Sequence, residues 1–339
     1  MFKIIINETK KIVKNRYSNY FKNKNILLVG CSGVVGQYFF SFFINLLNTK
    51  NSPKSITAIN KSKNSNYFNF FKKSKKVKII KMDLIKIDFK KLKKYDCIIF
   101  SAGYGQPYKF LFNPVETVKL NTDILNQFIL KLRKNGKFLF LSSSEVYNGN
   151  YRKNLSEEDI GKTNTNDPRA CYIEAKRCGE CLINIYRKKY GVDAKSVRLC
   201  LAYGPGPNKK DNRVLYEFIE RSINKKILEI KDSGLAKRKY IYILDSVHMM
   251  LNILVFGRNE IYNVAGKDTI SIRALGKKIA NIFKIKFKFK NNKNYLEGSP
   301  KNISLSIKRY ESEFGCLNFT KFDLGLKNTI NWFNLLYKR

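Results

Sequence analysis

The sequence has a single histidine, His248, among 339 residues, and this scarcity argues against several common kinds of site. A histidine-ligated zinc site and a Ser-His-Asp triad both need histidine beside other reactive groups. No carboxylate–histidine cluster accompanies His248, which lies in an apolar stretch with helical spacing. We therefore expect His248 to have a structural role, and we expect no metal site.

Cysteine and long apolar runs are also scarce. The seven cysteines are odd in number and show no spacing typical of a disulfide framework, which fits a reducing compartment. Cys178 and Cys181 form one C-x-x-C in a helical pattern with no second pair, so we expect two small buried side chains. No apolar run reaches the roughly 18–20 residues of a membrane helix, and the N-terminus lacks a secretory signal. We expect a soluble, cytoplasmic protein without membrane insertion.

Acidic residues are few, because 26 Asp and Glu face 66 Lys and Arg, for a formal net charge of +40. Such an excess can indicate binding to nucleic acid or to a membrane surface. Here, however, the lysines are dispersed through every segment, and no nucleic-acid-binding motif is present. We expect no nucleic-acid partner, although the charge favours the encounter with anionic substrates.

A glycine-rich segment, GCSGVVG at residues 30–36, follows the apolar run 25–29 and precedes the apolar run 38–47. This order is typical of a strand, a tight turn and a helix. Glycines permit the turn and let the backbone approach a pyrophosphate, which the N–H groups at the start of the helix then face. The segment predicts a dinucleotide-binding site.

Strand and helix patterns alternate after residue 24, which predicts an α/β fold with a Rossmann-type, doubly wound parallel sheet. We expect a basic N-terminal extension (1–24) with a helix packed on the core or at an interface. An NAD(P)-binding domain with the catalytic residues (25–203) follows, and then a smaller C-terminal α/β substrate lobe (204–339) with segments that return to the core. The predicted strands are 26–29, 56–59, 77–80, 97–100, 138–141 and 194–198, the main predicted helices are 114–134 and 172–190, and Phe39, Phe40, Phe42 and Phe43 are predicted to face the core.

Tyr172 and Lys176 are four residues apart on a predicted helix and share one of its faces. An ammonium beside a phenol favours the phenolate and lowers the tyrosine pKa, so that the tyrosine becomes a usable general base. The pair opens the helix that follows the fifth strand, at the sheet edge where a nicotinamide would lie. The same edge carries the hydroxyl of Ser143, which can hydrogen-bond a substrate oxygen.

The chain resembles the extended short-chain dehydrogenase/reductases, the NAD-dependent epimerases, dehydratases and decarboxylases of nucleotide sugars. The resemblance runs from Asn25 nearly to the end of the chain. The residues and motifs on which the resemblance rests are the glycine turn, Asp83, the Ser-Ala-Gly at 101–103, Asn121, the Ser-Glu-Val-Tyr at 144–147, Tyr172 with Lys176, Arg198, the Tyr-Gly-Pro-Gly at 203–206, and Arg238.

The resemblance implies roles for particular residues. Ser143 would orient the substrate, Tyr172 would be the acid/base, Lys176 its partner, and Glu145 a second acid/base. Ser144, Arg169 and Arg238 would contact the substrate, Arg238 at its diphosphate. The residues implied at the cofactor, with Asp83 near the adenine, are Gly30, Ser32, Gly33, Val34, Val35, Gly36, Asn60, Asp83, Leu84, Ala102, Gly103, Asn121, Tyr172 and Lys176.

Within this family the Ser144-Glu145 and Arg169-Ala-Cys-Tyr172 segments look most like UDP-glucuronate decarboxylases. That implies a bound NAD(P) that transiently oxidises C4 of a nucleotide-diphosphate sugar. NAD is expected, with NADP open, because Asn60 and Lys61 stand where an acidic residue usually grips the ribose. Substrate-contacting positions of the relatives are Leu201 and 301–303 here, so 4,6-dehydration and 4-epimerisation stay as alternatives.

Two further expectations concern assembly and a rival function. Relatives commonly dimerise through two helices per subunit, which predicts a homodimer formed by 114–134 and 172–190. A non-catalytic dinucleotide-binding sensor or scaffold would share the same fold and glycine turn. The combination of Ser143, Tyr172 and Lys176 favours the enzyme.

Overall fold

The structure is a computed structural model that describes residues 1–61, 66–69, 74–209, 211–224, 226–230, 233–289 and 302–337. Much of the expected loop or weak helix at 61–76 and the expected turn at 298–300 lie outside the described residues, as does Lys301. Of that first region the structure describes one short helix, α3 (Asn66–Asn69).

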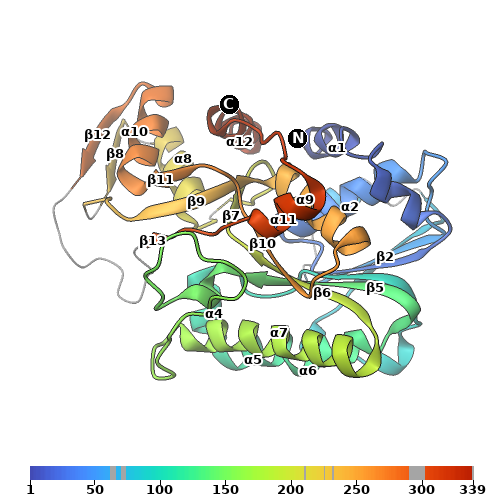
Figure 1. Cartoon of the computed structure of the whole chain (residues 1–339). Coiled ribbons are helices and arrows are strands. Elements are labelled where there is room, and N and C mark those ends of the chain that lie inside the picture. Colours follow the sequence, from blue (N-terminus) through green and yellow to red (C-terminus); the bar gives the residue numbers. More distant parts are fainter. Residues whose placement is uncertain are drawn as a thin grey trace.

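The central element is a seven-stranded parallel sheet with the strand order β10-β6-β5-β4-β1-β2-β3 (Figure 1). Most of its strands are buried on both faces, which is why they read as continuous apolar runs in the sequence. The six predicted strands are confirmed, and β10 is a seventh that the sequence did not indicate. The strands are β1 (Asn25–Val29), β2 (Ser55–Asn60), β3 (Val77–Lys81), β4 (Tyr95–Phe100), β5 (Leu132–Ser143), β6 (Asp193–Leu199) and β10 (Ile261–Val264).

Helices cover both faces of this sheet, as the α/β prediction requires (Figure 1). One face carries α2 and α9, whose apolar side chains join a large core that includes the four predicted phenylalanines of α2, all fully buried. The other face carries α5, α6 and α7 over a smaller core. The helices are α2 (Val34–Leu46), α9 (Ile243–Phe256), α5 (Pro114–Asn121), α6 (Asp123–Ile129) and α7 (Ala170–Tyr190).

The single helix predicted at 114–134 is interrupted at one residue, and it ends at Ile129. The chain breaks at Thr122, whose backbone leaves the helical region (φ −119°, ψ −89°), and it resumes as α6, which ends at Ile129. From Leu132 the backbone is already in β5, where Leu132 pairs with Tyr95 of β4. The helix predicted at 172–190 is present as α7.

The N-terminal segment contains the expected helix, α1 (Lys3–Lys10), followed by the 3-10 turn η1 (Arg16–Phe21). Its apolar side chains, such as Ile5, are fully buried in the large core. The carboxylate of Glu8 accepts hydrogen bonds from Tyr38 (2.5 Å) and from Tyr242, and burial raises the pKa of Glu8. This segment is therefore built into the core, and the domain boundary at residue 24 stays a prediction.

From β7 onward most elements form a second layer at one end of the molecule, with β7 and β9 in a small sheet and β8 beside β12 (Figure 1). The exceptions are α9 and β10, which return to the main sheet, and α11, which packs against them. No helix in the described part of the chain is long and apolar enough to cross a membrane. The remaining elements are α4 (Pro107–Phe112), β7 (Leu201–Tyr203), α8 (Val214–Asn224), β8 (Ile227–Ile230), β9 (Lys237–Tyr242), β11 (Thr269–Ser271), α10 (Ile272–Phe283), β12 (Lys286–Phe289), β13 (Asn302–Ile303), α11 (Lys308–Phe314), α12 (Phe322–Leu336) and the 3-10 turns η2 (Leu84–Lys86), η3 (Phe89–Lys91) and η4 (Ser144–Tyr147).

Two side-chain expectations have opposite outcomes. His248 has the structural role expected, because its Nδ1 lies 3.0 Å from the Tyr17 hydroxyl and its Nε2 lies 3.3 Å from the Asn252 amide. Cys178 and Cys181 were expected to be buried, and both are exposed. They lie on the outer side of α7, which the helical pattern alone did not reveal.

Candidate active site

The glycine turn joins the end of β1 to the start of α2, and its three glycines differ in what the protein demands of them. Gly30 has φ +85°, and a Cβ there would lie 2.5 Å from the Ala102 nitrogen. A Cβ on Gly36 would lie 2.4 Å from the Gly30 oxygen. Gly33 is the N-cap of α2, and a Cβ there would meet nothing closer than 3.6 Å. Protein packing therefore explains Gly30 and Gly36, whereas Gly33 leaves open space before a helix N-terminus, which fits a pyrophosphate.

Ser32, Val34 and Val35 complete this turn, and Gln37 fixes it from within α2. The Gln37 amide donates to the Ser32 carbonyl (3.0 Å) and to the Gly206 carbonyl (3.2 Å). This side chain thus ties the predicted cofactor turn to the Tyr-Gly-Pro-Gly loop at 203–206. This link could not be predicted from the sequence, because the two segments are about 170 residues apart.

At the adenosine end of the predicted cofactor site, Asn60 ends β2 and is buried, and its Oδ1 has no hydrogen-bond partner within the described structure. Lys61 forms an ion pair with Asp83 at 2.9 Å, and the hydrogen bond with Asp83 raises the pKa of Lys61. Asp83 and Leu84 follow β3. An enclosed, unsatisfied amide oxygen beside a carboxylate fits the expected contact with ribose and adenine.

Ala102, Gly103 and Asn121 lie between the glycine turn and the reactive residues. Ala102 lies against Gly30, and a Cβ on Gly103 would be 3.7 Å from Lys176 Nζ. Asn121 is buried at the end of α5, and its Oδ1 has no hydrogen-bond partner in the described part of the chain. These contacts connect the predicted cofactor residues with the start of α7.

The predicted reactive residues gather where β5 ends and α7 begins. Ser143 is the last residue of β5 and caps η4 by accepting from the Glu145 N–H at 3.2 Å. Burial raises the pKa of Tyr172 to about 12, which a hydrogen bond from Ser143 opposes and the charge of Glu145 reinforces. The tyrosine ring stacks on Phe110 of α4 with centroids 4.6 Å apart and an interplanar angle of 12°.

Lys176 is buried one helical turn along α7 from Tyr172. Its ammonium donates to the Leu141 carbonyl at 2.6 Å and lies over the Phe140 ring. Burial lowers the pKa of Lys176 to about 7. The pKa of Tyr172 is raised in this structure because desolvation of the phenol outweighs the opposing effects, and its lowering by Lys176 stays a prediction.

Glu145 and Arg169 form an ion pair, with 2.8 Å between Arg169 Nη2 and a Glu145 carboxylate oxygen. Arg169 is buried at the N-cap of α7, its guanidinium faces the Phe110 ring, and its Nε has no hydrogen-bond partner in the part of the chain described. Ser144 lies between Ser143 and Glu145 in η4. The two predicted substrate-facing charges therefore hold each other beside Tyr172.

Arg238 lies elsewhere, on β9 of the C-terminal sheet, where it is paired in register with Ile270 of β11. Leu201 is on β7 of the same sheet. The structure therefore brings Ser143, Glu145, Arg169, Tyr172 and Lys176 into one group and places Arg238 in the second layer.

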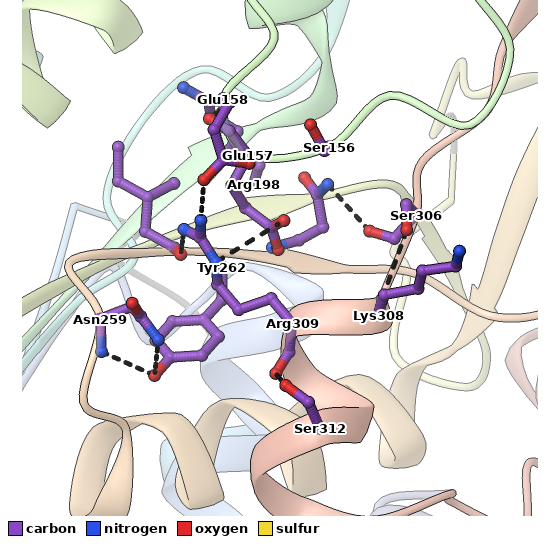
Figure 2. Close-up of polar contacts among 12 residues, drawn as sticks. Ser156, Glu157, Glu158, Arg198, Asn259, Tyr262, Ser306, Lys308, Arg309 and Ser312 are labelled. Carbon is purple, nitrogen blue, oxygen red and sulfur yellow. Dashed lines mark hydrogen bonds and ion pairs between the residues drawn. The ribbon is translucent and has the colours of Figure 1, made fainter.

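The loop between η4 and α7 is held by the segment that leads into α11 (Figure 2). Arg309 forms ion pairs with Glu157 (3.9 Å) and Glu158, and it donates to the Ile261 carbonyl of β10 at 2.8 Å. The Ser306 N–H donates to the Leu155 carbonyl at 2.8 Å. A C-terminal segment thus fixes the loop that connects Glu145 with Arg169.

Two groups at this site were not predicted. Phe110, the ring under Tyr172, is distant in sequence and gave no signal. Glu180, four residues after Lys176, is buried and is paired with Arg198 at 2.8 Å. The repetition of the four-residue spacing from Tyr172 through Lys176 to Glu180 is the signal that would have indicated it.

The sheet is doubly wound and parallel, with a glycine turn after its first strand. A tyrosine–lysine pair lies beside a serine at its carboxyl edge. These are features of the short-chain dehydrogenase/reductase class. Residues 26–265 match the sequence model of the NAD dependent epimerase/dehydratase family, and the chain belongs to this family. The resemblance drawn from the sequence is thereby confirmed.

Individual proteins show similar sequences and folds. UDP-glucuronic acid decarboxylase 1 of Xenopus tropicalis is 33% identical over 160 residues, which are 47% of this chain and 38% of that protein. The chain spans about half the length of the curated relatives it matches. The UDP-N-acetylglucosamine 4-epimerase of Methanobrevibacter ruminantium M1 has a TM-score of 0.78 at 23% identity, covering 92% of this chain and 98% of that one. For the UDP-glucuronic acid 4-epimerase of Bacillus cereus, solved with UDP-glucuronic acid and NAD, the TM-score is 0.77 at 20% identity, with coverage of 92% and 100%.

Proposed function

We propose that this protein is an NAD-dependent enzyme that acts at C4 of a nucleotide-diphosphate sugar, with chemistry like that of the UDP-glucuronate decarboxylases. The observation that carries the proposal is the grouping of Ser143, Tyr172 and Lys176 at the carboxyl edge of the sheet, joined through Gly103 and Ala102 to the glycine turn. The Glu145–Arg169 pair beside Tyr172 and the similarity to UDP-glucuronic acid decarboxylases support the choice within the family.

The residues described fit a dinucleotide, because Gly33 leaves space at the start of α2 and Asn60 has an enclosed, unsatisfied oxygen. The residues that would hold it are Gly30, Ser32, Gly33, Val34, Val35, Gly36, Asn60, Asp83, Leu84, Ala102, Gly103, Asn121, Tyr172 and Lys176. When bound, NAD supplies the acceptor for the C4 hydride and returns that hydride at the end of the cycle.

Tyr172 removes the proton of the sugar 4-hydroxyl as the C4 hydride leaves, so that C4 becomes a ketone. Ser143 holds the same oxygen, and the Lys176 ammonium stabilises the phenolate that acts as base. A carboxylate on C5 is then β to a ketone and can leave as CO2, with its electron pair retained at C5. C5 then takes up a proton, which Glu145 relays from solvent, and Tyr172 returns its own proton to the 4-oxygen when C4 is reduced again. Glu145 is paired with Arg169 at 2.8 Å. Ser144, Arg169 and Arg238 remain the proposed substrate contacts.

A substrate panel tests the proposal and separates the alternatives. The purified protein with NAD is incubated with UDP-, GDP-, dTDP- and CDP-sugars, including UDP-glucuronate. The masses of the products are measured by mass spectrometry. Decarboxylation removes the mass of CO2, 4,6-dehydration removes the mass of water, and 4-epimerisation leaves the mass unchanged with a new configuration. The expected result is loss of CO2 from a uronate, whereas no product from any sugar would support the non-catalytic sensor or scaffold.

Cofactor choice gives a separate prediction. Because the Lys61 charge is paired with Asp83 at 2.9 Å, we expect NAD to bind more tightly than NADP. Asp83→Asn frees the Lys61 ammonium for a 2′-phosphate, so the ratio of NADP to NAD affinity should rise several-fold, measured by calorimetry. Asp88→Asn makes the same charge change at another carboxylate that pairs with a lysine (Lys91), and there the ratio should stay at the wild-type value. An unchanged ratio in Asp83→Asn would mean that Lys61 does not face the ribose.

We also propose that the protein is a homodimer formed through α5 and α7, which pack side by side. The exposed apolar side chains on these helices include Val115 (60%), Val118 (41%) and Ile185 (45%), and association would cover them. Sedimentation equilibrium measures the oligomeric state.

The absence of disulfides among the seven cysteines supports a cytoplasmic location.

A further inference from the structure

The proposed reaction makes no use of Glu180, a buried carboxylate on α7 one turn beyond Lys176. Its two oxygens accept from Ser142 Oγ at 2.5 Å and from Arg198 Nη2 at 2.8 Å. Arg198, on β6, is buried as well, and its Nη1 also donates to the Tyr147 hydroxyl at 2.8 Å. A buried ion pair of this kind contributes little net stability compared with apolar side chains of similar volume. Its presence calls for another explanation.

The contacts between β5 and α7 supply that explanation. Three consecutive residues of the strand each lie against one of three residues spaced by four on the helix. The Leu141 carbonyl accepts from Lys176 at 2.6 Å and Ser142 donates to Glu180 at 2.5 Å, whereas the Ser143 hydroxyl is close enough to Tyr172 to lower the pKa of that phenol. Glu180 is therefore one of three residues of α7 that lie against the end of β5. The other two are the proposed reactive residues Tyr172 and Lys176.

Glu180 also affects the charge of Lys176. On α7, Lys176 lies one turn after Tyr172 and one turn before Glu180, and the Glu180 charge acts on the ammonium. β5 presents uncharged groups, and Arg198 of β6 is held by Glu180. Burial lowers the pKa of Lys176, and the Glu180 charge acts against that effect. Glu145 and Arg169, from η4 and the start of α7, exert their charges on Tyr172.

We propose that Glu180 is a positioning residue for the reaction: its carboxylate keeps Lys176 in the ammonium form and, through Ser142, fixes the end of β5 so that Ser143 meets Tyr172. This inference rests on the proposed acid/base role of Tyr172 and Lys176. It assigns a role to Glu180 that acts only through its neighbours, without contact between Glu180 and the sugar.

The test is Glu180→Gln, which keeps the shape and removes the charge. Activity that needs a charged Lys176 is lost as the pH rises through the pKa of that amine. Without Glu180 this alkaline limit should move to lower pH by at least about one unit, so that activity lost at pH 8 returns toward the wild-type value near pH 6. Glu180→Asp keeps the charge and should restore the wild-type limit. Asp211→Asn removes a carboxylate from a second buried carboxylate–arginine pair, with Arg213, and should leave the limit in place.

A second readout is independent of turnover. The protein is labelled with [6-13C]lysine, bound to NAD, and the Lys176 signal, assigned by its loss in Lys176→Arg, is titrated by NMR. Its midpoint should fall in Glu180→Gln by the same amount as the kinetic limit. If wild-type protein converts no sugar, the proposed function fails, and this titration still tests the role of Glu180.

An unchanged midpoint together with a loss of activity that is equal at every pH would overturn the inference and leave Glu180 with a structural role only. Where Glu180→Gln alone fails to fold, the double variant Glu180→Gln/Arg198→Met removes both charges of the buried pair. That variant should show the same downward shift of the Lys176 midpoint, and a wild-type midpoint in it would also overturn the inference.

Discussion

Replacement of Tyr172 by phenylalanine should abolish most of the turnover and leave the protein folded and able to bind NAD. The change removes one hydroxyl, which is the group proposed to take the proton from the sugar, so kcat should fall by about 10²–10⁴-fold. The ring stack on Phe110, 4.6 Å away, does not involve the hydroxyl and should persist. Turnover is measured by mass spectrometry with the best sugar of the panel, and NAD affinity by calorimetry.

Tyr310→Phe is the matched control for this variant. Tyr310 is also buried, and its hydroxyl also has a hydrogen-bond partner, the Asn252 amide at 2.9 Å, but it lies on α11 away from the reactive group. Both variants lose one buried hydroxyl and should lose about 1 kcal/mol of stability. Only Tyr172→Phe should lose turnover. Full activity in Tyr172→Phe would show that another group transfers the proton.

The pH dependence of wild-type turnover follows from the same two groups. Burial holds the pKa of Tyr172 at about 12 and that of Lys176 at about 7 in this structure. Tyr172 is therefore a neutral phenol near pH 7, and it can act as a base only while a charged Lys176 stabilises the phenolate that forms. Activity should decline as the pH rises above the pKa of Lys176, opposite to the rise expected if free phenolate alone were limiting.

The sequence predicted the parts of this architecture that local pattern controls. A strand of a sheet covered on both faces is usually apolar along its whole length, and the predicted strands 26–29 and 97–100 are such runs. The glycine turn was predictable because a strand ends at Val29 and a helix follows it. The end of the helix at 114–134 was mispredicted because residues 130–134 look like its continuation, although Leu132 pairs with Tyr95, a partner that local pattern cannot reveal.

The site was predictable in its residues and less so in its electrostatics. The spacing of Tyr172 and Lys176 indicated that they share a helix face, and the structure groups them with Ser143 and Glu145. The pKa of Tyr172 is raised and not lowered, because its largest cause is burial of the phenol, which comes from tertiary packing. Arg238 was expected at the substrate's diphosphate; it lies on β9 of the small C-terminal sheet, and this contact stays a prediction.

Alanine substitutions at Gly33 and Gly36 should also have large effects. Each substitution tests a different role of the glycine turn. In Gly36→Ala the new Cβ would lie 2.4 Å from the Gly30 oxygen and 2.6 Å from the Cys31 Cα, and both are backbone atoms. The start of α2 would have to move away from β1, which should cost at least about 3 kcal/mol of stability. The midpoint of thermal unfolding without NAD measures this loss.

Gly33→Ala should instead leave stability nearly unchanged and weaken NAD binding. Its φ of −69° and ψ of 159° suit alanine, and the new Cβ would be 3.6 Å from its nearest neighbour, so stability should change by less than about 1 kcal/mol. The methyl group would instead occupy the space proposed for the pyrophosphate, and NAD affinity should fall by at least about tenfold, or about 1.4 kcal/mol. A Gly33→Ala variant that binds NAD as tightly as the wild type would place the pyrophosphate elsewhere. An unfolded Gly33→Ala variant would instead mean that packing, and not the cofactor, requires glycine there.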